Sequence, residues 1–67
     1  QMTDRQKLVK MYENLVQEIK TAENNILFFT GNSKTANKLV EDMRKKIDTL
    51  KQQLNDLENK INQLDAE

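Results

Sequence analysis

The sequence contains no cysteine and no histidine. Without cysteine, the chain can form neither a disulfide nor a thiolate metal site. Without histidine, it lacks the usual general base and the commonest metal ligand. We therefore expect a protein that is not an enzyme, with no catalytic residues, no metal site and no cofactor.

The sequence also lacks an excess of charge of one sign and any long apolar run. Eleven basic and eleven acidic side chains cancel, which argues against bulk attraction to nucleic acid or to anionic lipid. The longest apolar run, residues 26–29, is too short for a membrane span or a signal peptide. We expect no nucleic-acid binding, no direct membrane insertion and a cytoplasmic location. The chain begins with Gln1 and ends in charge without a tail, so we interpret it as a segment excised from a larger protein.

Proline is absent and glycine occurs once, so a break in the backbone is expected only at residues 30–33. On both sides of this break, apolar residues recur at alternating spacings of four and three. This repeat keeps one apolar seam on one side of each helix. The first seam contains Leu8, Tyr12, Leu15, Ile19, Ala22, Ile26 and Phe29. The second seam contains Ala36, Val40, Met43, Ile47, Leu50, Leu54, Leu57, Ile61 and Leu64.

The pattern predicts an all-α fold in which two long helices form an antiparallel coiled-coil hairpin. Helix 1 is expected at about 3–29, the turn at 30–32 and helix 2 at about 33–65. A turn this short makes the two helices antiparallel neighbours with facing seams. The whole chain, 1–67, is then a single domain.

The helix ends carry matching signals. Thr3 and Gln6 are spaced as a capping box for helix 1. Gly31 is expected to take a left-handed conformation and to stop that helix. Either Asn32 or Ser33 can cap the start of helix 2.

Two registers of the hairpin remain open. With the tightest turn, paired residue numbers sum to 62, and Leu15 faces Ile47. In a register shifted by one heptad, the numbers sum to 69, and Ile19 faces Leu50. The second register covers Leu57 better but needs a looser, ten-residue connection. Loop length favours the first.

Three apolar residues near the turn, Leu27, Phe28 and Leu39, lie off the seam. They fit two interpretations. Either the loop or the first turn of helix 2 folds over them as a small cap, or they form an exposed patch that binds a partner. In the second interpretation Leu27 and Phe28 are apolar anchors, and Lys38 and Lys45 join Leu39 near the same end as a rim. These five residues are the candidate partner-binding site.

Helix 2 alone also suits a parallel two-stranded coiled coil. Its a positions are β-branched or Leu (Val40, Ile47, Leu54 and Ile61) and its later d positions are Leu (Leu50, Leu57 and Leu64), a composition typical of such dimers. A homodimer through the C-terminal part of helix 2 is therefore an alternative, because helix 1 need not cover the segment after residue 54. The chain would then be a structural oligomerisation or spacer segment of a larger protein.

Two stretches resemble a known family. Residues 18–26, Glu-Ile-Lys-Thr-Ala-Glu-Asn-Asn-Ile, and residues 45–57, Lys-Lys-Ile-Asp-Thr-Leu-Lys-Gln-Gln-Leu-Asn-Asp-Leu, are similar to the homology-region-1 repeat. This repeat occurs in protein kinase N-type kinases and in fungal protein kinase C. Ala22 stands where the family often has glycine, and the linker between the two stretches is shorter than in some members. The resemblance implies an antiparallel coiled-coil effector domain in signalling, which binds a GTP-loaded Rho-family GTPase without catalysis of its own.

Overall fold

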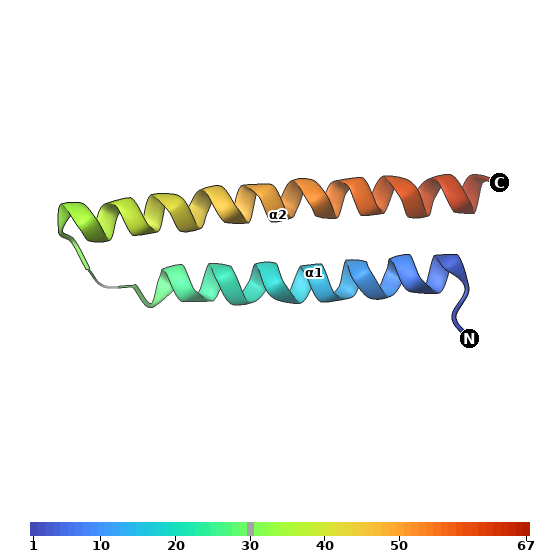
Figure 1. The fold of residues 1–67 in the computed structure, drawn as a ribbon, viewed down its shortest axis with the longest axis horizontal. Coiled ribbons are helices and arrows are strands. Elements are labelled where there is room, and N and C mark those ends of the chain that lie inside the picture. The colour runs from blue at the N-terminus through green and yellow to red at the C-terminus, as the bar shows by residue number, and fades with distance from the viewer. Residues whose placement is uncertain (30) are drawn as a thin grey trace.

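The computed structural model describes residues 1–29 and 31–67. Helix α1 spans Asp4–Leu27 and helix α2 spans Lys34–Ala66, and the two run antiparallel side by side (Figure 1). The part of the chain that the structure describes contains no strand. The prediction of an all-α helical hairpin is confirmed.

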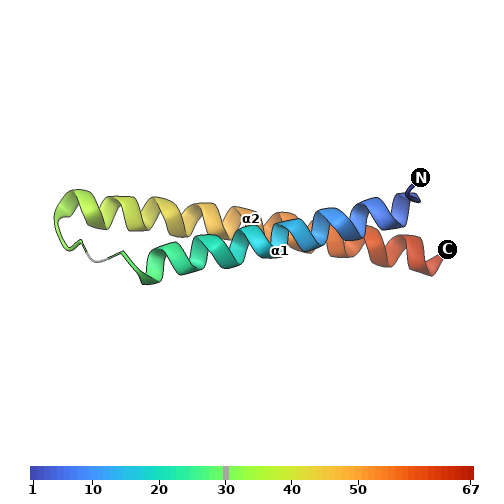
Figure 2. The same ribbon diagram turned by 90° about the horizontal axis from the view of Figure 1, so that it is seen from below.

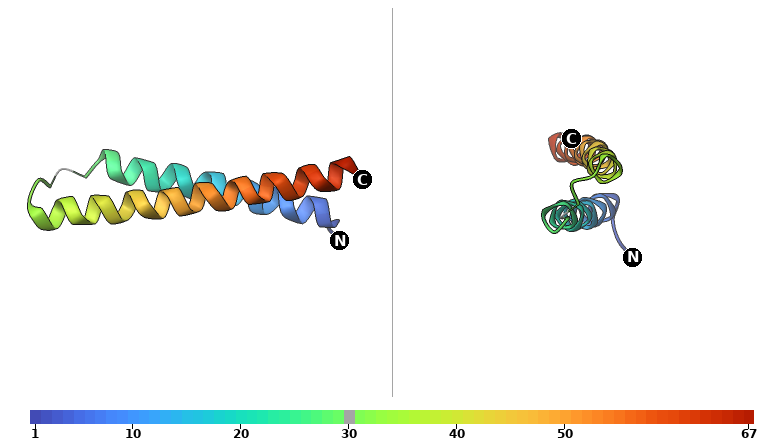
Figure 3. Two further views of the ribbon diagram at one scale, coloured as in Figure 1. Left: turned by 90° about the horizontal axis from the view of Figure 1, so that it is seen from above. Right: turned by 90° about the vertical axis from the view of Figure 1, so that its left-hand side faces the viewer.

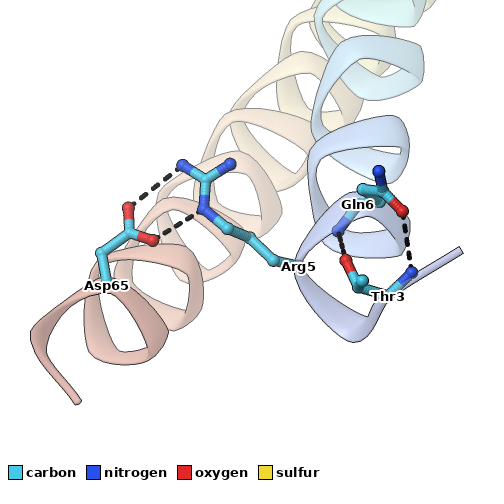
Figure 4. Close-up of polar contacts among 4 residues, drawn as sticks. All are labelled: Thr3, Arg5, Gln6 and Asp65. Atoms are coloured by element: carbon cyan, nitrogen blue, oxygen red, sulfur yellow. Dashed lines mark hydrogen bonds and ion pairs between the residues drawn. The ribbon is translucent and has the colours of Figure 1, made fainter.

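The start of α1 is fixed by the predicted capping box (Figure 4). The Thr3 hydroxyl accepts a hydrogen bond from the Gln6 backbone N–H at 3.1 Å. The Gln6 side-chain oxygen accepts one from the Thr3 backbone N–H at 2.8 Å. At the start of α2, the Ser33 hydroxyl accepts from the Ala36 N–H at 3.1 Å. Of the two cap candidates there, Ser33 is therefore the one used.

The end of α1 differs from the prediction. Phe28 is the C-terminal cap, and the Phe29 N–H donates to the Ile26 carbonyl at 3.1 Å. This tighter bond closes the last turn two residues before Gly31. No glycine in the described ranges has a positive φ. The expectation that a left-handed Gly31 stops the helix is therefore wrong.

The core lies along the seam between the helices. Leu15, Ile19, Leu50 and Leu57 form its buried centre. Three half-buried residues pack around this centre: Leu8, Tyr12 and Leu54. The helices cross at a shallow angle and lie side by side over the length of α1 (Figure 2).

The register is the one whose residue numbers sum to about 69. Arg5 Nε lies 2.6 Å from Asp65 Oδ1. In the register that sums to 62, Arg5 would lie level with Leu57, about 12 Å along α2 from Asp65. Ile19 and Leu50 also share the buried centre. The register that loop length favoured is therefore wrong.

The C-terminal segment of α2 is covered by α1. Leu57 is buried, and Ile61 and Leu64 are half-buried. The expectation that helix 1 need not cover the chain after residue 54 is therefore wrong. A parallel homodimer through this segment would have to displace α1.

The offset between the end of α1 and the start of α2 explains why a short connection is compatible with the register that sums to 69. In this register, α2 begins about two turns beyond the level at which α1 ends (Figure 1). The two helix ends that the connection joins are therefore offset along the rod and not level. Ala36, which α1 does not reach, is nevertheless buried. No ten-residue connection is needed.

Gly31 is required for close packing and not for a left-handed conformation. A Cβ at this position would lie 2.7 Å from Ala36 Cβ and 3.2 Å from a ring carbon of Phe29. The first distance is shorter than a van der Waals contact, and the Ala36 methyl has no rotamer by which to move away. Glycine therefore lets the link lie directly on α2.

We expect Gly31→Ala to destabilise the hairpin by about 1–3 kcal/mol, because the added methyl overpacks this contact. The change is measured by urea unfolding followed by circular dichroism. Introduced together with Ala36→Gly, which removes the opposing methyl, Gly31→Ala should lose most of its cost. If Gly31→Ala stabilises the chain, as it would within one continuous helix, this packing is wrong.

Candidate functional site

Three apolar residues near the turn are exposed, Leu27 and Phe28 at the end of α1 and Leu39 on α2, and together they are here called the turn-end patch. The exposed fractions of these residues are 77%, 82% and 49%. The link therefore does not cover Leu27 or Phe28, and neither side chain belongs to the buried core. Of the two interpretations of these residues, the structure contains the exposed patch and not the cap.

Phe29, the neighbour of Phe28, is also exposed but much less so. Its exposed fraction is 36%, against 82% for Phe28. Phe28 is the C-terminal cap of α1, and Phe29 follows the helix. Of the two rings, Phe28 therefore offers a partner more apolar surface.

The two candidate lysines lie on the exposed surface of α2 and form ion pairs within this helix. Lys38 Nζ lies 3.1 Å from Asp42 Oδ1, and Lys45 Nζ lies 3.4 Å from Glu41 Oε1. The hydrogen bond to Asp42 and the nearby negative charges raise the pKa of Lys38. Lys45 lies two turns further along α2 than Lys38, so it is at the edge of the candidate site. The acidic partners partly cancel the positive charge of both lysines.

A third cation near the patch was not among the predicted site residues. Arg44 lines a hollow together with Leu27, Ile26 and Glu23. Lys51 bridges the two helices beside this hollow, with its Nζ 3.6 Å from Glu23 Oε2. In the register that sums to 69, Arg44 lies near Glu23, so the sequence alone could have indicated Arg44. Loop length favoured the other register, and Arg44 was therefore not among the predicted site residues.

The opposite end of the hairpin is closed by a two-pronged ion pair (Figure 4). Arg5 donates through Nε and Nη2 to the two carboxylate oxygens of Asp65, at 2.6 and 3.1 Å. These bonds lower the pKa of Asp65 and raise the pKa of Arg5. Because the pKa of Asp65 is depressed in the fold, its contribution to stability is lost as the pH falls through this lowered value. The pair is exposed, so its contribution is small.

The described residues bring together no chemistry beyond this surface. Within residues 1–29 and 31–67, no group of three or more acidic side chains could hold a metal ion. Neither α1 nor α2 is long and apolar enough to cross a membrane. No protein-family model, curated protein or solved structure matches the chain.

Proposed function

We propose that the hairpin is a non-catalytic protein-interaction module that binds its partner through the turn-end patch. The observation that carries this proposal is the exposure of Phe28 directly beside Leu27. Both side chains leave apolar area in water although the fold does not require them there. Contiguous apolar surface of this kind usually marks a binding site.

The composition of the patch fits a small interface. A few buried aromatic or aliphatic anchors supply most of the binding energy in protein interfaces. Phe28 and Leu27 are such anchors, and Leu39 adds a further exposed apolar side chain on α2. Lys38, Lys45 and Arg44 supply surrounding positive charge, which speeds association with an acidic partner surface more than it tightens the complex.

A GTP-loaded Rho-family small GTPase is the partner we propose. The proposal is supported by the resemblance of residues 18–26 and 45–57 to the Rho-effector repeat. A helical hairpin is also the architecture that this resemblance implies. The chain would then act as an effector domain in cytoplasmic signalling.

This proposal is tested by titrating the hairpin into Rho-family proteins loaded with a non-hydrolysable GTP analogue or with GDP. Calorimetry should detect binding to the GTP form and weaker or no binding to the GDP form. A hairpin that binds neither form at high micromolar concentration contradicts the choice of partner. Equal binding to both forms contradicts the role as an effector.

A further inference from the structure

Asn32 differs from the other asparagines of the chain in its position. It lies in the connection between the helices, is exposed, and directly precedes the Ser33 cap of α2. The other asparagines all lie within α1 or α2: Asn14, Asn24, Asn25, Asn37, Asn55, Asn59 and Asn62. The first turn of α2 forms the tip of the rod (Figure 3). Asn32 is therefore in contact with water at the turn end and outside both helices.

The backbone nitrogen that follows Asn32 is not held by a helix. As the cap of α2, Ser33 contributes its hydroxyl, which accepts from the Ala36 N–H at 3.1 Å. It also contributes its carbonyl oxygen, which accepts from the Asn37 N–H at 2.9 Å. The N–H of a cap residue precedes the hydrogen-bond ladder of the helix and takes no part in it. The nitrogen after a helical asparagine, in contrast, is fixed by its bond to the carbonyl four residues earlier.

We propose that Asn32 is a modification site, where the Ser33 backbone nitrogen attacks the side-chain amide and converts the asparagine into aspartate or isoaspartate. The residue that follows an asparagine controls this attack, because its side chain stands beside the attacking nitrogen. Ser33 is small and carries no branch at Cβ, so it leaves the nitrogen open. The helical asparagines are followed by leucine, asparagine, isoleucine, lysine, aspartate or glutamine, which are all larger than serine. Position, backbone freedom and neighbour thus favour the reaction at Asn32.

The reaction needs water and no other reagent. The Ser33 nitrogen gives its proton to a base in the solvent and forms a bond to Asn32 Cγ. The bond from Cγ to Nδ2 breaks, and the amide nitrogen takes up a proton and leaves as ammonia. Water then opens the cyclic imide, either between the Ser33 nitrogen and Cγ, which gives aspartate, or between that nitrogen and the Asn32 carbonyl carbon, which gives isoaspartate. One water is consumed and one ammonia is released, with no oxidation or reduction.

The aspartate product suits the start of α2. The first turn of this helix contains no acidic residue and begins with Lys34. The N-terminus of a helix carries a partial positive charge, which a carboxylate nearby stabilises and a lysine does not. The hairpin should therefore stay folded when Asn32 becomes aspartate, while the turn end gains a negative charge. Where the turn-end patch binds a partner, which rests on the proposed function, this charge is added at the binding end of the rod.

Incubation of the wild-type chain at mildly alkaline pH, followed by mass spectrometry and peptide mapping, tests the site without any binding partner. The mass gained when a hydroxyl replaces the amide NH₂ should appear first at residue 32, and fragmentation of that peptide separates aspartate from isoaspartate. Asn37 is the internal control, because it is also exposed but lies in the first turn of α2. It should keep its amide over the period in which Asn32 reacts. A chain in which Asn32 keeps its amide as long as Asn37 does overturns the proposal.

Two variants of Ser33 test the attacking nitrogen and keep a residue that can cap α2. Ser33→Gly removes the side chain beside the nitrogen and should speed the loss of the amide several-fold. Ser33→Thr adds a branch at Cβ and should slow it several-fold. Equal rates in wild type and both variants would mean that the Ser33 nitrogen does not attack, and would overturn the mechanism. Asn32→Asp carries the charge of the product, and its helicity should match that of the wild type. A loss of helicity in Asn32→Asp would contradict the tolerance of the fold. None of these results depends on the GTPase titration, so the modification and the proposed partner can fail separately.

Discussion

Ile47→Asp should unfold the hairpin. Ile47 is 6% exposed and faces α1 in the middle of the rod. Truncating a buried isoleucine alone costs about 2–5 kcal/mol, and an unpaired buried carboxylate adds a further penalty. The hairpin has one seam and no disulfide to offset this loss. The far-ultraviolet circular dichroism of Ile47→Asp should therefore show little helix at room temperature.

Thr49→Asp is the matched control, because it places the same side chain two residues away on the exposed surface of α2. It removes only the hydrogen bond from the Thr49 hydroxyl to the Lys45 carbonyl. Its helicity and melting temperature should stay close to those of the wild type. If Ile47→Asp melts at the same temperature as Thr49→Asp, the seam is not the core of this protein.

Leu57→Ala should cost about 2–5 kcal/mol of unfolding free energy. Leu57 is 9% exposed and lies in the centre of the core with Leu15 and Ile19. This burial depends on the register, since the register that sums to 62 leaves residue 57 near the first residues of the chain and poorly covered. Urea unfolding of Leu57→Ala therefore measures the register as well as the packing.

Leu27→Ala makes the same chemical change at an exposed site and should alter stability by less than about 0.5 kcal/mol. Leu27 is in the last turn of α1 and outside the core. Equal stability losses for Leu57→Ala and Leu27→Ala would contradict the observed register. A loss at least several times larger for Leu57→Ala supports it.

The elements that could be predicted from the sequence are those set by local chemistry. The alternation of four and three places Leu15 and Leu50 on facing seams, and both are buried. Thr3 with Gln6, and Ser33 before α2, form the caps that their side chains allow. Each of these features depends on residues within about one turn, so the sequence alone specifies it.

The register could not be predicted because the two possible registers differ little in free energy. Both registers satisfy the heptad repeat and bring the same two seams face to face. Loop length favours the first register, but α2 starts beyond the level at which α1 ends, so a short connection also fits the second register. The close approach of Gly31 to Ala36 permits this connection, and contact between the link and the helix is not visible in a linear pattern.

The candidate site was predicted in part for the same reasons. Leu27 and Phe28 break the heptad, so their position off the seam follows from spacing alone, and both are exposed. Arg44 was missed because its proximity to Leu27 requires the longer register. The ion pairs of Lys38 and Lys45 join residues four positions apart, so the sequence contained that signal.

The measurement that tests the central claim most directly is calorimetric titration of wild type and Phe28→Ala against the GTP-loaded Rho-family protein. Removing an anchor ring should weaken binding by about 1–3 kcal/mol, or roughly 5- to 150-fold, and leave helicity unchanged. Met2→Ala, which truncates a half-exposed apolar residue at the opposite end, should bind like wild type. A Phe28→Ala variant that binds as tightly as Met2→Ala, or one that loses its helicity, would contradict the assignment of the turn-end patch as the binding surface.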